Sequence, residues 1–262
     1  VDIIIHAAAY KHVGLLQTQP HVAIENNFLS TKILYDFAKK HNVANFLLIS
    51  TDKAVRPTNI MGATKRFAEL ILQSMSQEVA TRMTMVRFGN VLGSSGSAIP
   101  LFQKQISHGG PVTVTHRKVT RYFMSIPEAA ELVIQAGALG KGGDVLVLDM
   151  GKPVNIYELA KRLINLSGLK LKDENNSDGD IEITFTGLRP GEKLYEELLI
   201  GNNVSTTSHN QIFRAEEVCV SKDEIQNIID KIIDISETND IDAYKDILEK
   251  VIHGYEKEDE IV

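Results

Sequence analysis

Apolar positions along the first 150 residues alternate between short continuous runs and helical spacing. Continuous runs rich in β-branched side chains predict buried strands over residues 1–9, 46–50, 83–88 and 144–148. Between them, apolar side chains recur every three or four residues and predict helices over 20–41, 59–75, 97–107 and 127–139. Strands that alternate with helices predict an α/β fold, a doubly wound parallel sheet with helices on both faces.

The pattern changes after Gly151. It predicts an amphipathic helix over Asn155–Ser167, a polar loop over 172–180 and a strand over 181–186. After the Arg189–Lys193 segment a further helix is expected through Leu199, and two acidic amphipathic helices are expected after Ser221. We therefore divide the chain into residues 1–150, which carry the sheet, and residues 151–262, a smaller α/β region followed by the last helices.

Composition and charge narrow the class of protein. The 262 residues contain 28 Lys and Arg against 34 Asp and Glu, a net charge of −6, which argues against a nucleic-acid partner. A single cysteine, Cys219, excludes an internal disulfide and a multi-thiolate zinc site, and the scattered histidines predict no metal centre. Without an apolar run of about 20 residues or a signal peptide, we expect a cytoplasmic location.

The chain opens at Val1 directly into a predicted strand, which indicates that residues precede it in the parent protein. A dinucleotide-binding half begins with Gly-x-Gly-x-x-Gly between a strand and a helix, and this chain contains no such spacing. We therefore expect the pyrophosphate site, the residue that separates NAD from NADP and any membrane anchor to lie upstream. The fragment alone is expected to bind NAD weakly and to have little activity.

Polar groups gather where the second strand ends. Thr51, Asp52 and Lys53 supply a hydroxyl, a carboxylate and an amine at the edge where open α/β sheets place ligands. Such a cluster can polarise a substrate oxygen, donate a proton and accept one, although a helix-capping Thr or Asp beside a solvated Lys would look the same. Lys65 follows Met61 by four residues, on the same helix face. By themselves, this Met would be a core residue and this Lys a surface residue.

Five segments together resemble one enzyme family. They are His6–Val13, Ser50–Ala54, Met61–Lys65, Arg87–Ser97 and Arg189–Lys193, and they resemble in order the nucleotide-sugar 4,6-dehydratases of polysaccharide biosynthesis. These enzymes are extended short-chain dehydrogenases with a Rossmann-like sheet. Met61 occupies the place of the usual catalytic tyrosine. In having methionine there, the chain resembles the large, membrane-anchored, capsule-type subgroup of the family.

The resemblance implies a set of site residues. It places Thr51 at O4 of the sugar, Asp52 at O6 and Lys53 at C5, the last two being exchangeable, with Met61 in the tyrosine slot and Lys65 on the cofactor ribose. Cofactor contacts are implied for Ala7, Ala8, Lys11, Ser50, Lys65 and Phe88. Nucleotide-sugar contacts are implied for Asn90, Ser94, Ser97, Thr115, Arg121, Arg189 and Glu192, with the two arginines on the diphosphate and Glu192 on the uridine ribose. Asn27 is implied as supporting structure.

The resemblance also implies an activity. A homo-oligomer would convert a UDP-sugar into a 4-keto-6-deoxy sugar with NAD as cofactor, and UDP-N-acetylglucosamine is the substrate that the resemblance favours. Residues 1–150 would carry the catalytic segment, with substrate-binding insertions near 90–122, and residues 151–262 would hold the nucleotide sugar. Dehydration with inversion at C5, 4-epimerisation, and a non-enzymatic sensor or scaffold that reuses the fold stay open as alternatives.

Overall fold

The computed structural model describes residues 1–198, 204–238, 240–252 and 255, and the chain divides into two compact units. Unit 1 comprises Val1–Phe88, Ala130–Asp149 and the described part of Glu197–Val262, and unit 2 comprises Gly89–Ala129 and Met150–Glu196. This division differs from a single boundary at residue 150. The reason is that the chain returns to unit 1 after Glu196, where its last strands join the first sheet and its last helices join the first core.

Unit 1 is built on a six-stranded sheet in the order β1-β2-β3-β8-β13-β12. The strands β1 (Ile3–His6), β2 (Asn45–Ile49), β3 (Arg82–Arg87) and β8 (Asp144–Leu148) are parallel, which confirms the predicted α/β fold. Two antiparallel strands that the pattern did not predict, β13 (Ile212–Ala215) and β12 (Val204–Thr206), extend the sheet beyond β8.

The first strand is shorter and more exposed than the apolar run from Val1 predicts. It pairs with β2 alone among the described strands and forms one edge of the sheet. Ile4 and His6 face the core, whereas Ile3 and Ile5 on the other face are 55% and 52% exposed. The expected buried strand over residues 1–9 is therefore wrong in extent and in burial, because an edge strand covered on one face buries only alternate side chains.

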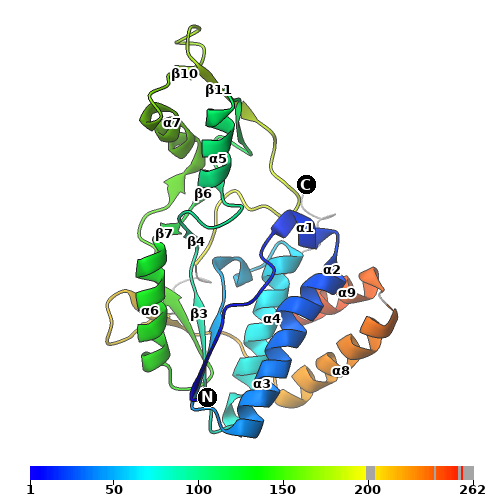
Figure 1. The fold of residues 1–262 in the computed structure, drawn as a ribbon. Coiled ribbons are helices and arrows are strands. Elements are labelled where there is room, and N and C mark those ends of the chain that lie inside the picture. Colours follow the sequence, from blue (N-terminus) through cyan, green and yellow to red (C-terminus); the bar gives the residue numbers. More distant parts are fainter. Residues whose placement is uncertain (199–203, 239, 253–254, 256–262) are drawn as a thin grey trace. The chain divides into compact units, whose positions relative to one another are not determined.

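Helices cover both faces of this sheet (Figure 1). On one face, α1 (Val13–Gln17) and α2 (Pro20–Ala23) lead through a π-helical turn (Ile24–Leu29) into α3 (Ser30–His41), and α4 (Ile60–Met75) lies beside α3 and ends in a 3₁₀ turn, Ser76–Glu78. On the opposite face, α6 (Ile126–Leu139) approaches so closely that a Cβ on Gly137 would meet Leu47. The helices predicted over 20–41, 59–75 and 127–139 are confirmed.

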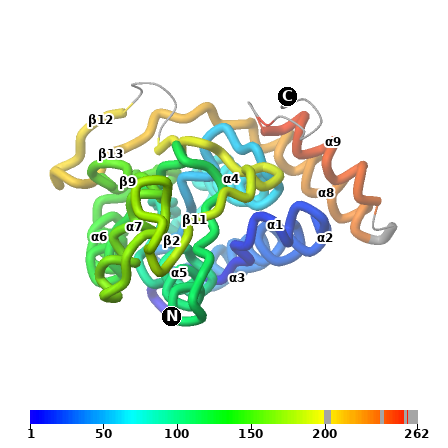
Figure 2. Tube along the Cα trace, turned by 90° about the horizontal axis from the view of Figure 1, so that it is seen from above, coloured from blue at the N-terminus to red at the C-terminus, as the bar shows by residue number. Residues whose placement is uncertain are grey.

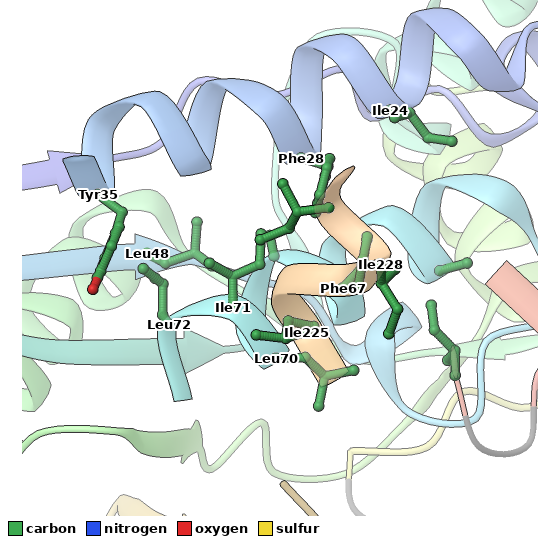
Figure 3. Packing of buried hydrophobic residues seen from close by; sticks show 14 of the residues in the cluster. Ile24, Phe28, Tyr35, Leu48, Phe67, Leu70, Ile71, Leu72, Ile225 and Ile228 are labelled. Atoms are coloured by element: carbon green, nitrogen blue, oxygen red, sulfur yellow. The ribbon is translucent and has the colours of Figure 1, made fainter. Parts of the chain in front are cut away.

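The core of unit 1 is centred on α4, whose side chains are buried almost throughout. Phe28 stacks on Phe67 at 4.3 Å between ring centres, and Ile71 and Leu48 extend the cluster (Figure 3). The two acidic helices, α8 (Lys222–Thr238) and α9 (Ile241–Val251), pack side by side on α4 (Figure 2). The apolar face of these amphipathic helices, including Ile225, is buried in this core.

Unit 2 has a separate core. A parallel sheet in the order β10 (Leu171–Lys172), β11 (Ile181–Phe185), β5 (Val112–Val114) packs with α5 (Ala98–Ser107) and α7 (Ile156–Leu166). Two small pairs complete the unit: β4 (Asn90–Val91) is parallel to β7 (Phe123–Met124), and β6 (Thr120–Arg121) is antiparallel to β9 (Val154–Asn155). No helix in the described residues is long and apolar enough to cross a membrane.

The helix expected after the Arg189–Lys193 segment, through Leu199, is wrong for residues 194–198, which form bends and irregular structure, and Leu199 lies outside the described residues. Within the preceding segment, Gly191 has a φ of 68°, in the left-handed region. The carbonyl of Leu194 accepts from the N–H of Thr120 at 3.1 Å, so the backbone bonds to a neighbouring segment instead of to its own next turn.

Candidate functional site

The Thr51-Asp52-Lys53 triplet follows β2 as a single 3₁₀ turn, Asp52–Ala54. Thr51 caps this turn, since its Oγ1 accepts from the N–H of Lys53 at 3.4 Å. The Thr51 hydroxyl donates to Asp52 Oδ1 at 2.9 Å, and Lys53 Nζ donates to the same oxygen at 3.0 Å. The capping contact of the alternative interpretation is therefore present, and the hydroxyl and the amine both contact the carboxylate of Asp52.

Asp52 is the buried member of this cluster. Its side chain is 0% exposed, and its Oδ2 has no hydrogen-bond partner among the described residues. A buried carboxylate oxygen without a partner is costly, because desolvation is not repaid by a hydrogen bond. The structure thus leaves one acid oxygen available to a ligand group, while Thr51 and Lys53 hold the other.

Lys65 and Met61 lie one turn apart on α4, and both are buried. Met61 belongs to the apolar core cluster. Burial lowers the pKa of Lys65 to about 8, against the opposing charge of Glu69. Lys65 is therefore not the surface lysine that its spacing alone would suggest, and it exchanges protons close to neutral pH.

A chain of hydrogen bonds joins the end of β1 to α4. His6 Nε2 lies 3.1 Å from Thr31 Oγ1, which itself donates to the carbonyl of Asn27, so the imidazole is the donor. Asn27 Oδ1 accepts from the N–H of Tyr10, and its Nδ2 donates to Thr64 Oγ1 at 3.2 Å. Burial, followed by the charge of Lys65, lowers the pKa of His6 to about 4. Asn27 therefore has the supporting contacts expected of it.

The remaining cofactor candidates lie at the carboxyl ends of neighbouring strands. Ala7, Ala8 and Lys11 follow β1 and are exposed, and Phe88 follows β3. Ser50 directly follows β2 but is buried, and its hydroxyl donates to Glu69 at 2.5 Å. Because the carboxyl ends of parallel strands meet at one edge, these segments and the triplet share that edge.

Three of the predicted substrate-binding residues meet within unit 2. Arg121 Nη2 donates to Glu192 Oε1 at 2.7 Å, and the Thr115 hydroxyl donates to the same oxygen at 3.1 Å. Arg121 Nε lies 3.5 Å from Glu196, a residue that sequence reasoning missed. Arg189 is exposed and contributes its backbone N–H to Glu192 Oε2. The guanidinium of Arg121 is thus held between carboxylates in this structure.

Asn90 opens β4, and Ser94 and Ser97 lie between β4 and α5 in the same unit. Asn90 Nδ2 donates to the carbonyl of Tyr122 at 3.2 Å, and the N–H of Ser97 donates to the carbonyl of Ser94. Ser97 sits at the N-cap of α5, where its buried Oγ has no partner among the described residues. A hydroxyl at the N-terminus of a helix can donate a hydrogen bond to an acceptor such as a phosphate oxygen.

Sequence reasoning also missed the buried charges Glu69, Arg87 and Glu217, whose ion pairs are 2.5–2.6 Å long. Two signals could have found the first two. Glu69 follows Lys65 by four residues on one helix face, and Arg87 is a charged residue in an otherwise apolar strand, which burial permits only with a partner. Glu217 gives no such signal, because it comes from a segment 130 positions away from its partner.

Comparison with known proteins agrees with the motif order. Residues 1–217 match the family described as polysaccharide biosynthesis protein. The chain belongs to this family. Two relatives are the capsular polysaccharide biosynthesis protein CapD of Staphylococcus aureus, 55% identical over 87% of the chain, and the probable polysaccharide biosynthesis protein EpsC of Bacillus subtilis, 55% identical over 77%. The chain spans 37% and 33% of their lengths, about a third.

Other family resemblances extend to nucleotide-sugar enzymes. A UDP-glucose 4-epimerase of Rickettsia canadensis is 36% identical over 78% of the chain and 58% of its own length. Among solved structures, Pen from Bacillus thuringiensis is 32% identical, with a TM-score of 0.73 over 87% of this chain and 75% of that one. A dTDP-glucose 4,6-dehydratase of Streptomyces venezuelae with NAD bound is 21% identical, with a TM-score of 0.67 over 76% and 64%, and shows the shared fold.

Proposed function

We propose that this family member carries the catalytic segment and nucleotide-sugar subsite of a NAD-dependent UDP-sugar 4,6-dehydratase for surface polysaccharide synthesis, acting on UDP-N-acetylglucosamine. The observation that carries the proposal is Asp52, a fully buried carboxylate. One of its oxygens has no partner in the part of the chain that the structure describes, and the other accepts from Thr51 and Lys53. Relatives named for capsule and polysaccharide synthesis, and a fold shared with a dTDP-glucose 4,6-dehydratase, support the same class.

The residues at the sheet edge fit the nicotinamide end of a dinucleotide. Ala7 and Ala8 present no bulky side chain after β1, and the buried Lys65 supplies an amine for a ribose hydroxyl. The sequence has no Gly-x-Gly-x-x-Gly for the pyrophosphate. When bound, NAD supplies hydride acceptance from C4 of the sugar and hydride return to C6.

The triplet supplies the proton transfers that dehydration requires. Thr51 hydrogen-bonds O4 of the sugar, and its own bond to Asp52 orients its hydroxyl. Once C4 is a ketone, the C5 proton is acidic. Transfer of a proton from Lys53 to Asp52 along their hydrogen bond leaves a neutral amine, which accepts the C5 proton, and a carboxylic acid, which gives its proton to O6 as the hydroxyl leaves as water. The roles of Asp52 and Lys53 are exchangeable. One acid and one base beside the C4 contact are what elimination across C5 and C6 needs.

A 4-epimerase is the second candidate, favoured by the 36% identical relative that bears this name. Epimerisation needs only the oxidation and reduction at C4, so the acid and base of the triplet would have no role. Mass spectrometry of the product separates the two candidates in the intact protein with NAD. We expect loss of water, entry of solvent deuterium at C5 and no net NADH. A product of unchanged mass supports epimerisation and refutes dehydration.

Two substitutions test the assigned roles. Arg189→Ala removes a cation proposed to hold the diphosphate, which keeps its charge throughout the reaction, so KM rises about 10- to 150-fold with kcat nearly unchanged. Asp52→Asn removes the acid and lowers kcat about 10²- to 10⁴-fold with little change in KM. Arg162→Ala, at an exposed arginine of the same unit, is the matched control. Full kcat in Asp52→Asn contradicts the triplet assignment.

A further inference from the structure

A buried charge network in unit 1 lies outside the groups that touch substrate or cofactor in the proposed reaction. Glu69 on α4 and Arg87 on β3 are both 0% exposed, and Arg87 Nη2 donates to Glu69 Oε2 at 2.6 Å. Arg66 pairs with the same carboxylate at 3.0 Å, and Arg87 Nη1 donates to Glu217 at 2.5 Å. Two guanidinium groups and two carboxylates therefore compensate one another, as burial of charge requires.

One end of the network reaches the triplet. Glu69 Oε1 accepts from the Ser50 hydroxyl at 2.5 Å, and Ser50 directly precedes residues 51–53. The backbone of this segment is also bonded to β3, because the N–H of Asp52 donates to the carbonyl of Phe88 at 3.1 Å. The position of the triplet thus depends on the strand that carries Arg87 and on the carboxylate that Arg87 holds.

The same carboxylate lies next to Lys65. Glu69 follows Lys65 by four residues, on one face of α4, and its charge counteracts the fall in the pKa of Lys65 that burial causes. The other titratable group coupled to Lys65 is His6, whose pKa is lowered to about 4 and whose imidazole is therefore neutral near pH 7. Glu69 thus connects the charge network both to Ser50, which precedes the triplet, and to Lys65.

The other end of the network lies in the segment after β13. Glu217 Oε2 is 3.2 Å from Arg66 Nη2, and the same guanidinium donates to the carbonyl of Val218 at 3.0 Å. The Ser74 hydroxyl donates to the carbonyl of Val220 at 2.7 Å. This C-terminal segment, residues 217–220, is therefore fastened along α4 by charged and neutral hydrogen bonds.

Building on the proposed function, we propose that Glu217 is a remote positioning residue: through Arg87 and Glu69 it holds the Ser50–Lys53 segment in place relative to Lys65. Without the Glu217 carboxylate, Arg87 keeps an uncompensated hydrogen-bonding edge in a buried site, and the simplest relief is a shift of its guanidinium away from Glu69. Glu69 and Ser50 would follow that shift. The C-terminal segment would then take part in the geometry of the reaction as well as in the stability of the core.

A second contact of the C-terminal helices provides a matched control. Glu78, after α4, forms ion pairs with Lys222 of α8 and with Lys39 of α3. It attaches the same C-terminal region to unit 1, but its ion pairs with Lys39 and Lys222 do not lead to Ser50 or Lys65. If Glu217 acts only by anchoring the last helices, Glu78→Gln and Glu217→Gln have the same consequences.

Two readouts test the proposal on Glu217→Gln, Glu217→Asp and Glu78→Gln. Steady-state kinetics of the intact protein should show kcat lowered about 10-fold in Glu217→Gln with an unchanged KM for the nucleotide sugar. NMR titration of the ¹³C-lysine-labelled protein, with Lys65 assigned from Lys65→Arg, should show the Lys65 pKa falling by about one unit, because removal of an anion leaves the two arginines in excess. Glu217→Asp keeps the charge and should restore most of both values.

An unchanged Lys65 pKa in Glu217→Gln, or an equal change in Glu78→Gln, overturns the proposal. An unchanged kcat in Glu217→Gln also overturns it. If the wild-type protein turns over no nucleotide sugar, the proposed function fails, while the Lys65 titration still decides whether Glu217 positions the site. If Glu217→Gln does not fold, the kinetics of Glu217→Asp, which keeps the charge on a shorter side chain, give the decision: a kcat below that of Glu78→Gln supports the proposal, and equal kcat values overturn it.

Discussion

Replacing Gly62 by alanine should displace the Thr51–Lys53 segment from α4. Gly62 lies in the first turn of that helix, where its N–H donates to the capping Asn59 side chain at 2.8 Å. A Cβ at this position would lie 2.1 Å from the carbonyl oxygen of Lys53 and 3.2 Å from Pro57 Cβ. Since real Cβ atoms essentially never approach closer than 3.0 Å, the carbonyl must retreat by about 0.9 Å. The obstacle is backbone, so no change of rotamer relieves it.

The cost of that shift can be estimated. Overpacking of a buried site costs about 1–3 kcal/mol, whereas alanine gains up to about 1 kcal/mol over glycine in helix propensity. Because the obstacle is backbone, the cost lies in the upper part of that range, about 2–3 kcal/mol. The net loss of unfolding free energy in Gly62→Ala is then about 1–2 kcal/mol, or a Tm lowered by about 2–8 °C. Because the displaced carbonyl belongs to Lys53, kcat should fall by more than the stability loss explains, up to about 10²-fold for a 1 Å displacement.

Urea denaturation and steady-state kinetics measure these two effects. Gly14→Ala is the matched control, because a Cβ on Gly14 in α1 has no atom within 4 Å and should leave stability unchanged or slightly higher. If Gly62→Ala is as stable and as active as the wild-type protein, α4 and the triplet are not packed as tightly as the structure shows, and the argument is refuted.

Two further predictions concern the core and its pH dependence. Phe28→Ala removes one ring of the buried stack with Phe67 and should lower the unfolding free energy by about 3–5 kcal/mol in urea denaturation. Ile33→Ala, at a 66% exposed position, is the control and should change the unfolding free energy by less than about 0.5 kcal/mol. Similar values for both variants would contradict the packing of Phe28 on Phe67. Stability should also fall in acid, because both His6 and Glu69 have folded-state pKa values below their unfolded ones. Unfolding therefore takes up a proton on His6 as the pH falls from 6.5 to about 4, and on Glu69 as it falls from 4.5 to about 2; a denaturation midpoint that is constant from pH 7 to pH 3 would contradict this.

The elements that hydrophobic spacing predicts well are those whose environment is local. α4 and β2 are buried on nearly every side, so their periodicity alone identifies them. β13 and the irregular Arg189–Glu196 segment depend on distant partners. β13 pairs with β8, and the carbonyl of Leu194 accepts a hydrogen bond from the N–H of Thr120. The backbone of such segments forms hydrogen bonds with distant residues, which the spacing of apolar residues does not reveal. For this reason the helix prediction is wrong over residues 194–198.

The candidate site shows the same division. Sequence motifs place Thr51, Asp52 and Lys53 together because they are adjacent in the chain, and Met61 and Lys65 because they are one helical turn apart. The clustering of Arg121 with Glu192 depends on tertiary packing, and the family resemblance supplied both residues without predicting that they pair with each other. Burial was the least predictable property: no local pattern distinguishes the buried Lys65 from a surface lysine.

Met61 determines how the proposed reaction must be organised. Its side chain is packed into the apolar core, and a thioether neither donates nor accepts a proton at neutral pH, so no rearrangement short of unfolding α4 brings proton chemistry to that position. Proton transfer in the proposed dehydration therefore falls to the triplet. In the proposed reaction this gives a role to the buried carboxylate of Asp52, whose Oδ2 has no hydrogen-bond partner among the described residues, an arrangement that costs free energy.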